Sequence, residues 1–220
     1  MPIDRIREAS GDCAPQNDDT QFDDTQFAGI LLAAGTGSRF DPSGARNKLM
    51  QPLADGASVA LCAARNLLAA LPVVLAVVRP GSDALAAQLR ALGCAVTECP
   101  SAEQGMGASL VHALLHTSEA AGWIIALADM PYVQHSTSIA LIDAIRRGAQ
   151  IAVPTFGGRR GNPVAFGRSH LPELLRLGGD QGARALLARY PVVEIAVDDP
   201  GIGRDIDTLI DLSFDARTDA

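Results

Sequence analysis

The sequence predicts an α/β fold with a doubly wound, Rossmann-like sheet that is mostly parallel. Short apolar segments alternate with segments of helical length along most of the chain, which is the pattern of repeated β-α-β units. Crossovers between such units are right-handed and place helices on both faces of a parallel sheet. A glycine-rich turn directly follows the first apolar segment, and ligands of this fold class bind at such turns.

Four strands are expected in the first two thirds of the chain. Apolar runs at 27–33 and 123–128, a β-branched run between two prolines at 73–78 and a shorter one at 95–98 predict them. Between them lie Ala/Leu-rich segments that end at proline or glycine. These segments predict helices over residues 58–71, 82–92, 106–120 and 136–147.

The last third of the chain is less regular. Expected strands at 151–154 and 163–166 enclose a glycine-rich turn at 156–161, which indicates an antiparallel excursion on the parallel sheet. Helices over 171–177 and 181–189 and a strand over 192–197 follow. Since no repeat or linker divides residues 27–215, we expect a single domain there and a short tail at 216–220.

The net charge of this 220-residue chain is −7, and residues 1–26 contribute most of it through seven acidic residues and two arginines. We expect this acidic leader to be disordered. The acidic balance argues against nucleic-acid binding, and no apolar run is long enough to span a membrane. The leader lacks the apolar core of a secretory signal. We therefore expect a cytoplasmic protein whose four cysteines are reduced.

The loop after the first strand combines glycines with positive charge. Gly35 and Gly37 let backbone N–H groups approach a ligand without Cβ clashes. Arg39 follows, and then Lys48, the one lysine beside seventeen arginines, an imbalance that genome composition also explains. A dinucleotide fingerprint is disfavoured because Phe40 stands at its third glycine position. A loop that binds a nucleoside triphosphate fits better, although the P-loop pattern is absent.

Three aspartates are candidates for a metal site. Asp129 follows the fourth strand, which in a doubly wound sheet typically lies beside the first, so it faces the same crevice as the glycine loop. Its carboxylate can hold Mg²⁺ on phosphates or simply form a turn. Asp205 and Asp207 share a face if they lie on a strand. Asp207 can instead cap a helix that begins at Thr208.

Six short motifs occur in order along residues 27–212. They are Leu32-Ala-Ala-Gly-x-Gly-x-Arg39 with Lys48-Leu49, Gly105-Met-Gly-Ala-Ser109, Asp129-Met-Pro131, Arg160-Gly-Asn-Pro163, Gly179-Asp-Gln-Gly-Ala-Arg184 and Asp205-Ile-Asp-Thr208. Together they resemble the signature of the MobA/MocA-like nucleotidyltransferases, and most closely its MocA-like molybdenum cofactor cytidylyltransferase branch. The loop from Arg39 to Lys48 is longer than in that family, and Asn162 and Leu209 replace its histidine and proline.

The resemblance implies a three-layer α/β/α nucleotidyltransferase fold and transfer of a nucleoside monophosphate with Mg²⁺ as cofactor. Catalytic roles fall on Arg39, Lys48 and Asp129, and metal binding on Asp129 with Asp207, or with Asp205 in its place. The implied nucleotide-binding residues are Leu32, Ala33, Ala34, Gly35, Thr36, Gly37, Arg39, Lys48 and Ser109. The implied acceptor-binding residues are Arg159, Asn162 and Asp180. Helix packing for Ser109, a surface turn for Arg159 and a helix cap for Asp180 are the structural alternatives.

The segment Ala33-Ala34-Gly35 resembles the cytidylyltransferase form of the first motif, where guanylyl-transferring relatives have Ala-Gly-Gly. We therefore expect CTP as donor and a molybdopterin-type acceptor, with a molybdoenzyme or its chaperone as partner. Three alternatives stay open at this point. They are another phosphorylated acceptor such as a sugar or polyol phosphate, a non-catalytic molybdenum cofactor carrier, and an NAD-dependent oxidoreductase, which Phe40 and Arg79 disfavour.

Overall fold

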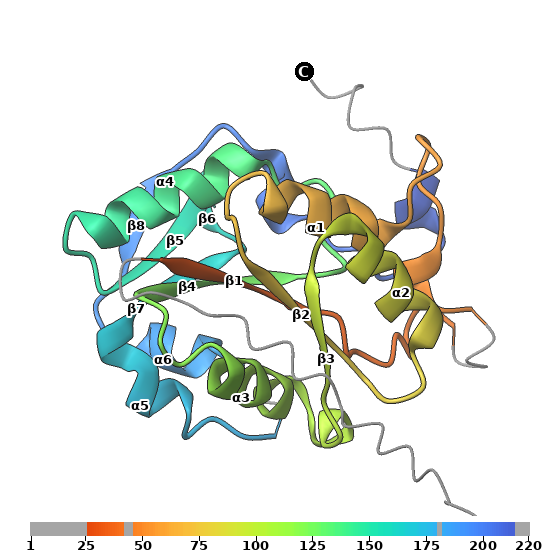
Figure 1. Cartoon of the computed structure of the whole chain (residues 1–220). Coiled ribbons are helices and arrows are strands. Elements are labelled where there is room, and N and C mark those ends of the chain that lie inside the picture. Colours follow the sequence, from red (N-terminus) through yellow and green to blue (C-terminus); the bar gives the residue numbers. More distant parts are fainter. Residues whose placement is uncertain (1–25, 42–45, 180–181, 214–220) are drawn as a thin grey trace, which may run out of the picture.

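The computed structural model describes residues 26–41, 46–179 and 182–213. Apart from Gln26, the expected leader lies outside the described residues, as do the expected tail at 216–220 and Asp180. Figure 1 shows the chain from the first strand near the centre to the last segments at the edge. Within the described ranges, no helix is long and apolar enough to cross a membrane.

One eight-stranded sheet forms the middle of the molecule, with the order β3-β2-β1-β4-β7-β5-β6 and with β8 beside β5. Strands β3, β2, β1 and β4 are parallel, whereas β7 runs antiparallel to both β4 and β5. This is the mostly parallel sheet with an antiparallel excursion that the sequence predicts. The strands are β1 (Phe27–Leu32), β2 (Val74–Val78), β3 (Ala95–Glu98), β4 (Gly122–Leu127), β5 (Ile151–Phe156), β6 (Arg159–Arg160), β7 (Val164–Gly167) and β8 (Val193–Ala196).

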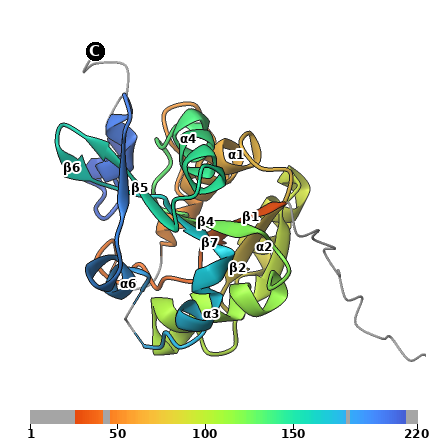
Figure 2. The same cartoon turned by 90° about the vertical axis from the view of Figure 1, so that its left-hand side faces the viewer.

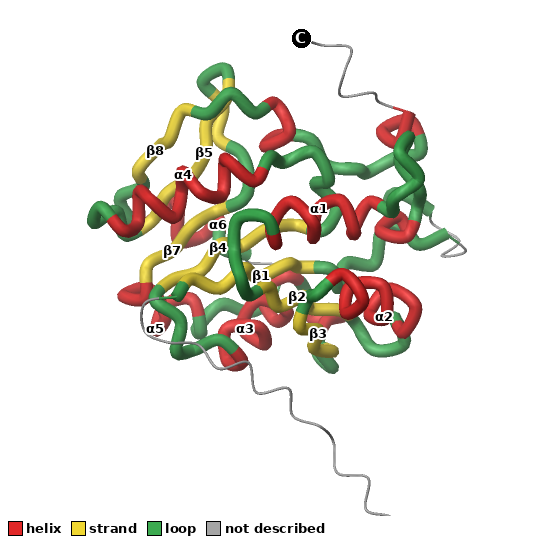
Figure 3. Tube along the Cα trace, turned by 45° about the horizontal axis from the view of Figure 1, so that its top comes forward, coloured by secondary structure: helices red, strands yellow, loops and turns green. Residues whose placement is uncertain are grey.

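Helices cover both faces of the sheet and complete three layers (Figure 3). Figure 2 shows α1 and α4 on one side of the strands and α3 and α6 on the other. Helix α2 shares the first side and α5 the second (Figure 1). The helices are α1 (Val59–Leu68), α2 (Asp83–Leu92), α3 (Met106–His116), α4 (His135–Arg146), α5 (Leu171–Leu174) and α6 (Arg184–Arg189). Short 3₁₀ turns include η1 (Lys48–Met50), η2 (Ala102–Gln104), η4 (Pro200–Gly203) and η5 (Ile210–Ser213).

Alternation along the strands divides the apolar core into two clusters. In β1, Ile30 packs in the cluster under α3, whereas its neighbour Leu31 packs in the cluster under α1, and neither is exposed. Successive side chains of a strand point to opposite faces, so an apolar run buried on both faces reads as continuous in the sequence. This explains why β1, β2 and β4 are unbroken apolar segments.

Element ends differ from the expectations by a few residues. Helix α1 ends at Leu68 rather than at residue 71, and α3 ends at His116 rather than at residue 120, because turns follow directly. The turn expected at 156–161 is instead partly strand, since β5 continues to Phe156 and pairs with Arg159 and Arg160 in β6. The three cysteines in the described part of the chain, Cys62, Cys94 and Cys99, are free thiols.

A buried aspartate joins the C-terminal segment to α4. Asp199 is 1% exposed. Its Oδ2 accepts hydrogen bonds from the Gln134 N–H and the Thr137 hydroxyl, at 2.8 and 2.6 Å, and its Oδ1 accepts one from Gly201 N–H at 2.9 Å. Gly201 is held so closely that a Cβ there would lie 2.2 Å from the Tyr132 carbonyl oxygen. This junction fixes the chain just before the segment that carries Asp207.

Replacing Asp199 with asparagine is expected to lower the free energy of unfolding by about 1–3 kcal/mol, since either orientation of the amide turns its NH₂ toward a buried donor. Urea denaturation measures the loss. The matched control is Asp198→Asn, which makes the same change at an exposed neighbour whose backbone carbonyl accepts a hydrogen bond from the Gln134 side chain. Equal stability of the two variants would contradict the role given to Asp199.

Candidate active site at the carboxyl ends of β1 and β4

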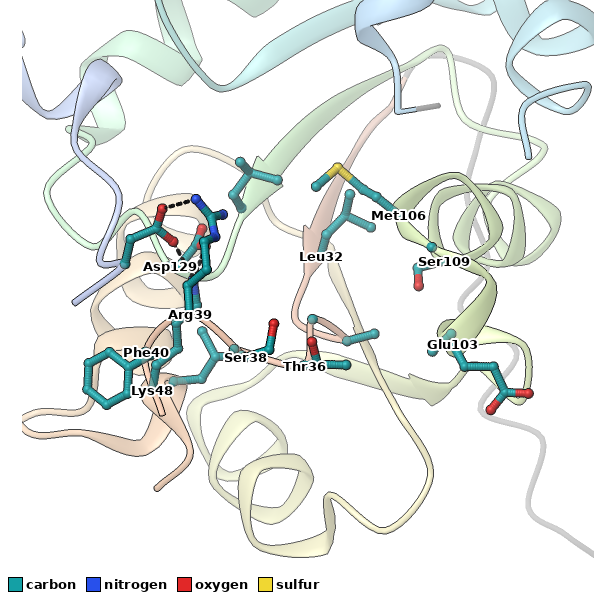
Figure 4. Close-up of a pocket in the computed structure, with 18 residues that line it drawn as sticks. Leu32, Thr36, Ser38, Arg39, Phe40, Lys48, Glu103, Met106, Ser109 and Asp129 are labelled. Atoms are coloured by element: carbon teal, nitrogen blue, oxygen red, sulfur yellow. Dashed lines mark hydrogen bonds and ion pairs between the residues drawn. The ribbon is translucent and has the colours of Figure 1, made fainter. Parts of the chain in front are cut away.

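A pocket of about 410 Å³ opens where β1 and β4 end side by side, at the paired residues Leu32 and Leu127. Its wall comes from the loop after β1, from η1, and from η2 with the start of α3. Figure 4 shows Arg39, Lys48 and Asp129 at one end and Glu103 and Ser109 at the other. The lining residues are Leu32, Ala34, Gly35, Thr36, Gly37, Ser38, Arg39, Phe40, Lys48, Leu49, Ala102, Glu103, Gly105, Met106, Ser109, Leu127, Asp129 and Asp207.

The two glycines of the loop after β1 differ in what the surrounding structure demands of them. Gly37 has φ of +63°, a left-handed conformation that side chains disfavour. Its carbonyl accepts from the N–H groups of Phe40 and Asp41, which closes the turn. A Cβ at Gly35 would meet no protein atom within 4 Å. Packing therefore does not demand glycine at residue 35, whereas a ligand lying on the backbone would.

Four charged side chains gather at one end of the pocket. The Lys48 Nζ lies 2.6 Å from Asp129 Oδ2 and 3.3 Å from Asp207 Oδ1. The Arg39 Nη1 lies 2.6 Å from the other oxygen, Oδ2, of Asp207. Lys48 is largely enclosed, with 11% of its side chain exposed, whereas the Arg39 side chain is 79% exposed. Two cations and two carboxylates thus balance each other at this end of the pocket.

Local hydrogen bonds hold the cluster in place. The Asn47 side chain caps η1 by accepting from Leu49 N–H at 3.0 Å, and Leu49 itself is buried. The Asp129 carbonyl accepts from Ile206 N–H at 2.8 Å, and the Ile206 side chain is buried in the core. The segment around Asp207 is therefore tied directly to the residue that follows β4.

Asp211 is a positioning residue that the motifs did not single out. Its Oδ2 accepts from the backbone N–H of Asp207 and from both the N–H and the hydroxyl of Thr208. Desolvation raises the pKa of Asp211, but these hydrogen bonds and the charge of Lys48 together outweigh it and hold the pKa below the usual value. The Thr208-x-x-Asp211 spacing, a capping-box pattern, was the available signal.

The two candidate partners of Asp129 are separated by the structure. Residues 204–207 form no strand, so the condition under which Asp205 and Asp207 would share a face is not met. Asp207 lines the pocket, whereas Asp205 is exposed outside it. Desolvation raises the pKa of the Asp205 carboxyl, and the nearby charges of Asp207 and Asp129 raise it further. The helix expected from Thr208 is a short 3₁₀ turn that begins at Ile210.

Ala33 does not line the pocket, although it belongs to the first motif. It is 3% exposed and packs in the core cluster under α1, while Ala34 lines the pocket. Ala33 and Ala34 point to opposite faces of the sheet, so Ala33 cannot take the place of Ala34 in the pocket wall. The remaining nucleotide-binding candidates, including the buried Ser109 at 3% exposure, do line it.

The described acceptor-binding candidates also lie outside the pocket. Arg159 is exposed on β6, and Asn162 faces a small separate cavity with Pro163 and Met130. The Asn162 N–H donates to the Ile202 carbonyl, which fixes this part of the hairpin against η4. Asp180 lies outside the described residues. The structure therefore does not bring this set together with the nucleotide-binding candidates.

Sequence reasoning identified only Ser109 on the far wall of the pocket. Ala102, Glu103 and Met106 line it from η2 and the start of α3. Gly105 joins the two with φ of +116°, which allows the chain to turn sharply into the helix. The Gly-Met motif marked this turn but not the residues before it.

These features define an α/β domain with a nucleotide-sized pocket at the switch point of its sheet. The model of the MobA-like NTP transferase domain matches residues 29–194, and the chain belongs to this family. The expected family and fold class are thereby confirmed, and the chain is a nucleotidyltransferase. No curated protein matches the sequence.

Solved structures agree with this assignment. Rv0371c from Mycobacterium tuberculosis H37Rv is similar at 29% identity with a TM-score of 0.71, over 85% of this chain and 95% of that one. A second structure of Rv0371c is a complex with manganese. Molybdopterin-guanine dinucleotide biosynthesis protein A from Archaeoglobus fulgidus shares the fold at 20% identity and a TM-score of 0.61, over 84% and 94% of the two chains.

Proposed function

We propose that this protein transfers CMP from CTP to the phosphate of a molybdopterin-type cofactor and releases pyrophosphate. The observation that carries the proposal is the cluster of Lys48, Arg39, Asp129 and Asp207 at one end of a pocket floored by the glycine loop. Phosphates require cations and N–H donors, and a divalent cation on phosphates requires carboxylates. This end of the pocket supplies each of these groups.

The residues act mainly through charge and positioning. The N–H groups of the loop around Gly35 and Gly37 receive the triphosphate, and Lys48 and Arg39 neutralise it. An oxygen of the acceptor's phosphate attacks the α-phosphorus of CTP, and the bond from that phosphorus to the pyrophosphate oxygen breaks. The acceptor oxygen is already ionised, so the reaction needs no strong general base. Arg159, Asn162 and Asp180 are proposed to bind the acceptor.

Asp129 and Asp207 are the proposed ligands of Mg²⁺. Both carboxylates contact one ammonium group, Lys48 Nζ, so their oxygens converge on a site fit for a cation. Across the described residues, no three His, Cys, Asp or Glu side chains form a metal-binding group. Two carboxylates suit Mg²⁺, which takes its remaining ligands from phosphates and water. Bound there, Mg²⁺ would stabilise charge that develops on the phosphates.

Ala34 supports the choice of CTP. Its side chain lines the pocket, and a methyl group there narrows the space for a base compared with the glycine of guanylyl-transferring relatives. The Ala34→Gly variant is expected to lower the ratio of kcat/KM for CTP to that for GTP by at least about tenfold. Ala33→Gly is the matched control, because it loosens the same backbone but changes a core position. An unchanged ratio in Ala34→Gly would contradict this role.

A panel of CTP, GTP, ATP and UTP with Mg²⁺ and molybdopterin tests the proposal through pyrophosphate release and the mass of the product. We expect release with CTP and formation of a cytosine dinucleotide. A clear preference for GTP would overturn the nucleotide assignment. Release only with sugar or polyol phosphates would overturn the assignment of the acceptor.

We also propose a cytoplasmic location, which the free thiols of the described cysteines support because disulfides are rare in that reducing compartment.

A further inference from the structure

The ammonium group of Lys48 stands where the proposed metal ligands converge. It contacts one oxygen of Asp129 at 2.6 Å and one of Asp207 at 3.3 Å. No other lysine occurs in the sequence. A divalent ion bound by the same two carboxylates would lie beside this enclosed positive charge. Since like charges in a partly buried site repel strongly, the ammonium and the metal compete for the pair.

The contacts of Lys48 suggest how this competition is resolved. A Cβ at Gly37 would lie 3.5 Å from Lys48 Cγ, so the stem of the lysine already runs along the glycine loop. A triphosphate on that loop would therefore lie beside the Lys48 side chain and could attract its ammonium. Arg39, whose side chain is 79% exposed, can leave Asp207 in the same way.

We propose that Lys48 is the resident counter-ion of the metal site, and that an arriving nucleotide opens the site by drawing its ammonium away. The inference rests on the proposed function in taking Asp129 and Asp207 as metal ligands and the glycine loop as the place where the triphosphate binds. In the absence of nucleotide, the ammonium occupies the position between the two carboxylates and so excludes cations from the solvent. The triphosphate removes this competitor and adds phosphate ligands, so nucleotide and metal bind cooperatively. The free protein binds divalent ions weakly.

Manganese binding to the nucleotide-free protein tests the proposal. Free Mn²⁺ is measured by electron paramagnetic resonance for the unmodified protein and for Lys48→Met. The variant is expected to bind Mn²⁺ at least about tenfold more tightly, equivalent to about 1.4 kcal/mol. Arg90→Met is the matched control, because it removes one positive charge from an exposed position on α2. It should leave the affinity unchanged. Adding Asp129→Asn to Lys48→Met should abolish the gain.

Unchanged or weaker Mn²⁺ binding by Lys48→Met would overturn the proposal. An equal gain in Arg90→Met would also overturn it, because it would show a general charge effect. If Lys48→Met does not fold, Lys48→Gln and the rise in Tm with added Mn²⁺ provide the same comparison. The Mn²⁺ result is independent of the substrate: tighter Mn²⁺ binding by Lys48→Met, together with no turnover of CTP by the unmodified protein, would retain the counter-ion role and reject the assignment of CTP.

Discussion

The Lys48→Ala variant is expected to lower kcat/KM for pyrophosphate release by about 10²–10³-fold, as does the loss of one preorganised donor in comparable sites. The lysine is largely enclosed and belongs to the pocket wall, so water cannot fully replace its charge. Lys48→Arg should recover little, because a planar guanidinium does not reproduce a compact ammonium between two carboxylates. Steady-state kinetics with CTP and Mg²⁺ measure both variants.

Arg46→Ala is the control for this experiment. Arg46 belongs to the same loop and is exposed, and its backbone N–H rather than its side chain binds Asp41. Its removal should leave kcat/KM close to that of the unmodified protein. Undiminished pyrophosphate release by Lys48→Ala would contradict the catalytic role of Lys48.

Loss of Lys48 should thus have opposite effects on two measurements: Mn²⁺ should bind more tightly, and kcat/KM for pyrophosphate release should fall.

The Asp129→Asn variant is expected to reduce Mg²⁺-dependent turnover by about 10³-fold, because a bound cation contributes several kcal/mol to stabilising the transition state. Asp207→Asn should have a smaller effect in the same direction, since Asp129 makes the shorter contact with the Lys48 ammonium, which marks the cation position. Turnover is measured as a function of Mg²⁺ concentration. Higher Mg²⁺ should restore part of the activity in Asp207→Asn.

Asp205→Asn provides the matched control for both carboxylates. Asp205 is two residues from Asp207 but is exposed outside the pocket. We expect nearly unchanged turnover, with the same Mg²⁺ dependence as the unmodified protein. A loss as large as that of Asp129→Asn would assign the second ligand to Asp205 and contradict the role given to Asp207.

The strands near the site were predictable because buried parallel strands are continuous apolar runs, and their order followed from the doubly wound topology. The segments around Ile30 and Ile124 have that pattern, and the two strands pair side by side as expected. Strand β6 was less predictable: it pairs locally with β5, but the residues that follow it are held by contacts with Ile202, far along the chain. A Cβ on Gly161, next to it, would lie 2.3 Å from the Ile202 carbonyl oxygen, a close approach that a glycine-rich sequence does not reveal.

The site was predictable as a set of residue types and less so as a geometry. The motifs identified Lys48, Asp129 and Asp207, but not that one ammonium would contact both carboxylates across 81 and 159 residues of sequence. Such a contact depends on the tertiary placement of three loops. The opposite orientations of Ala33 and Ala34 depend on where β1 ends, and this position is decided by packing rather than by the motif.

CTP labelled in turn at its α- and γ-phosphorus tests most directly the claim that CMP moves to a phosphorylated acceptor. With Mg²⁺ and molybdopterin, we predict that the α-label appears in the acceptor and the γ-label appears in pyrophosphate. Both transfers should fall together in Lys48→Ala. A γ-label in the acceptor would show phosphoryl transfer instead. Retention of both labels in CTP would show that no nucleotide reaches this acceptor, and either result would contradict the account.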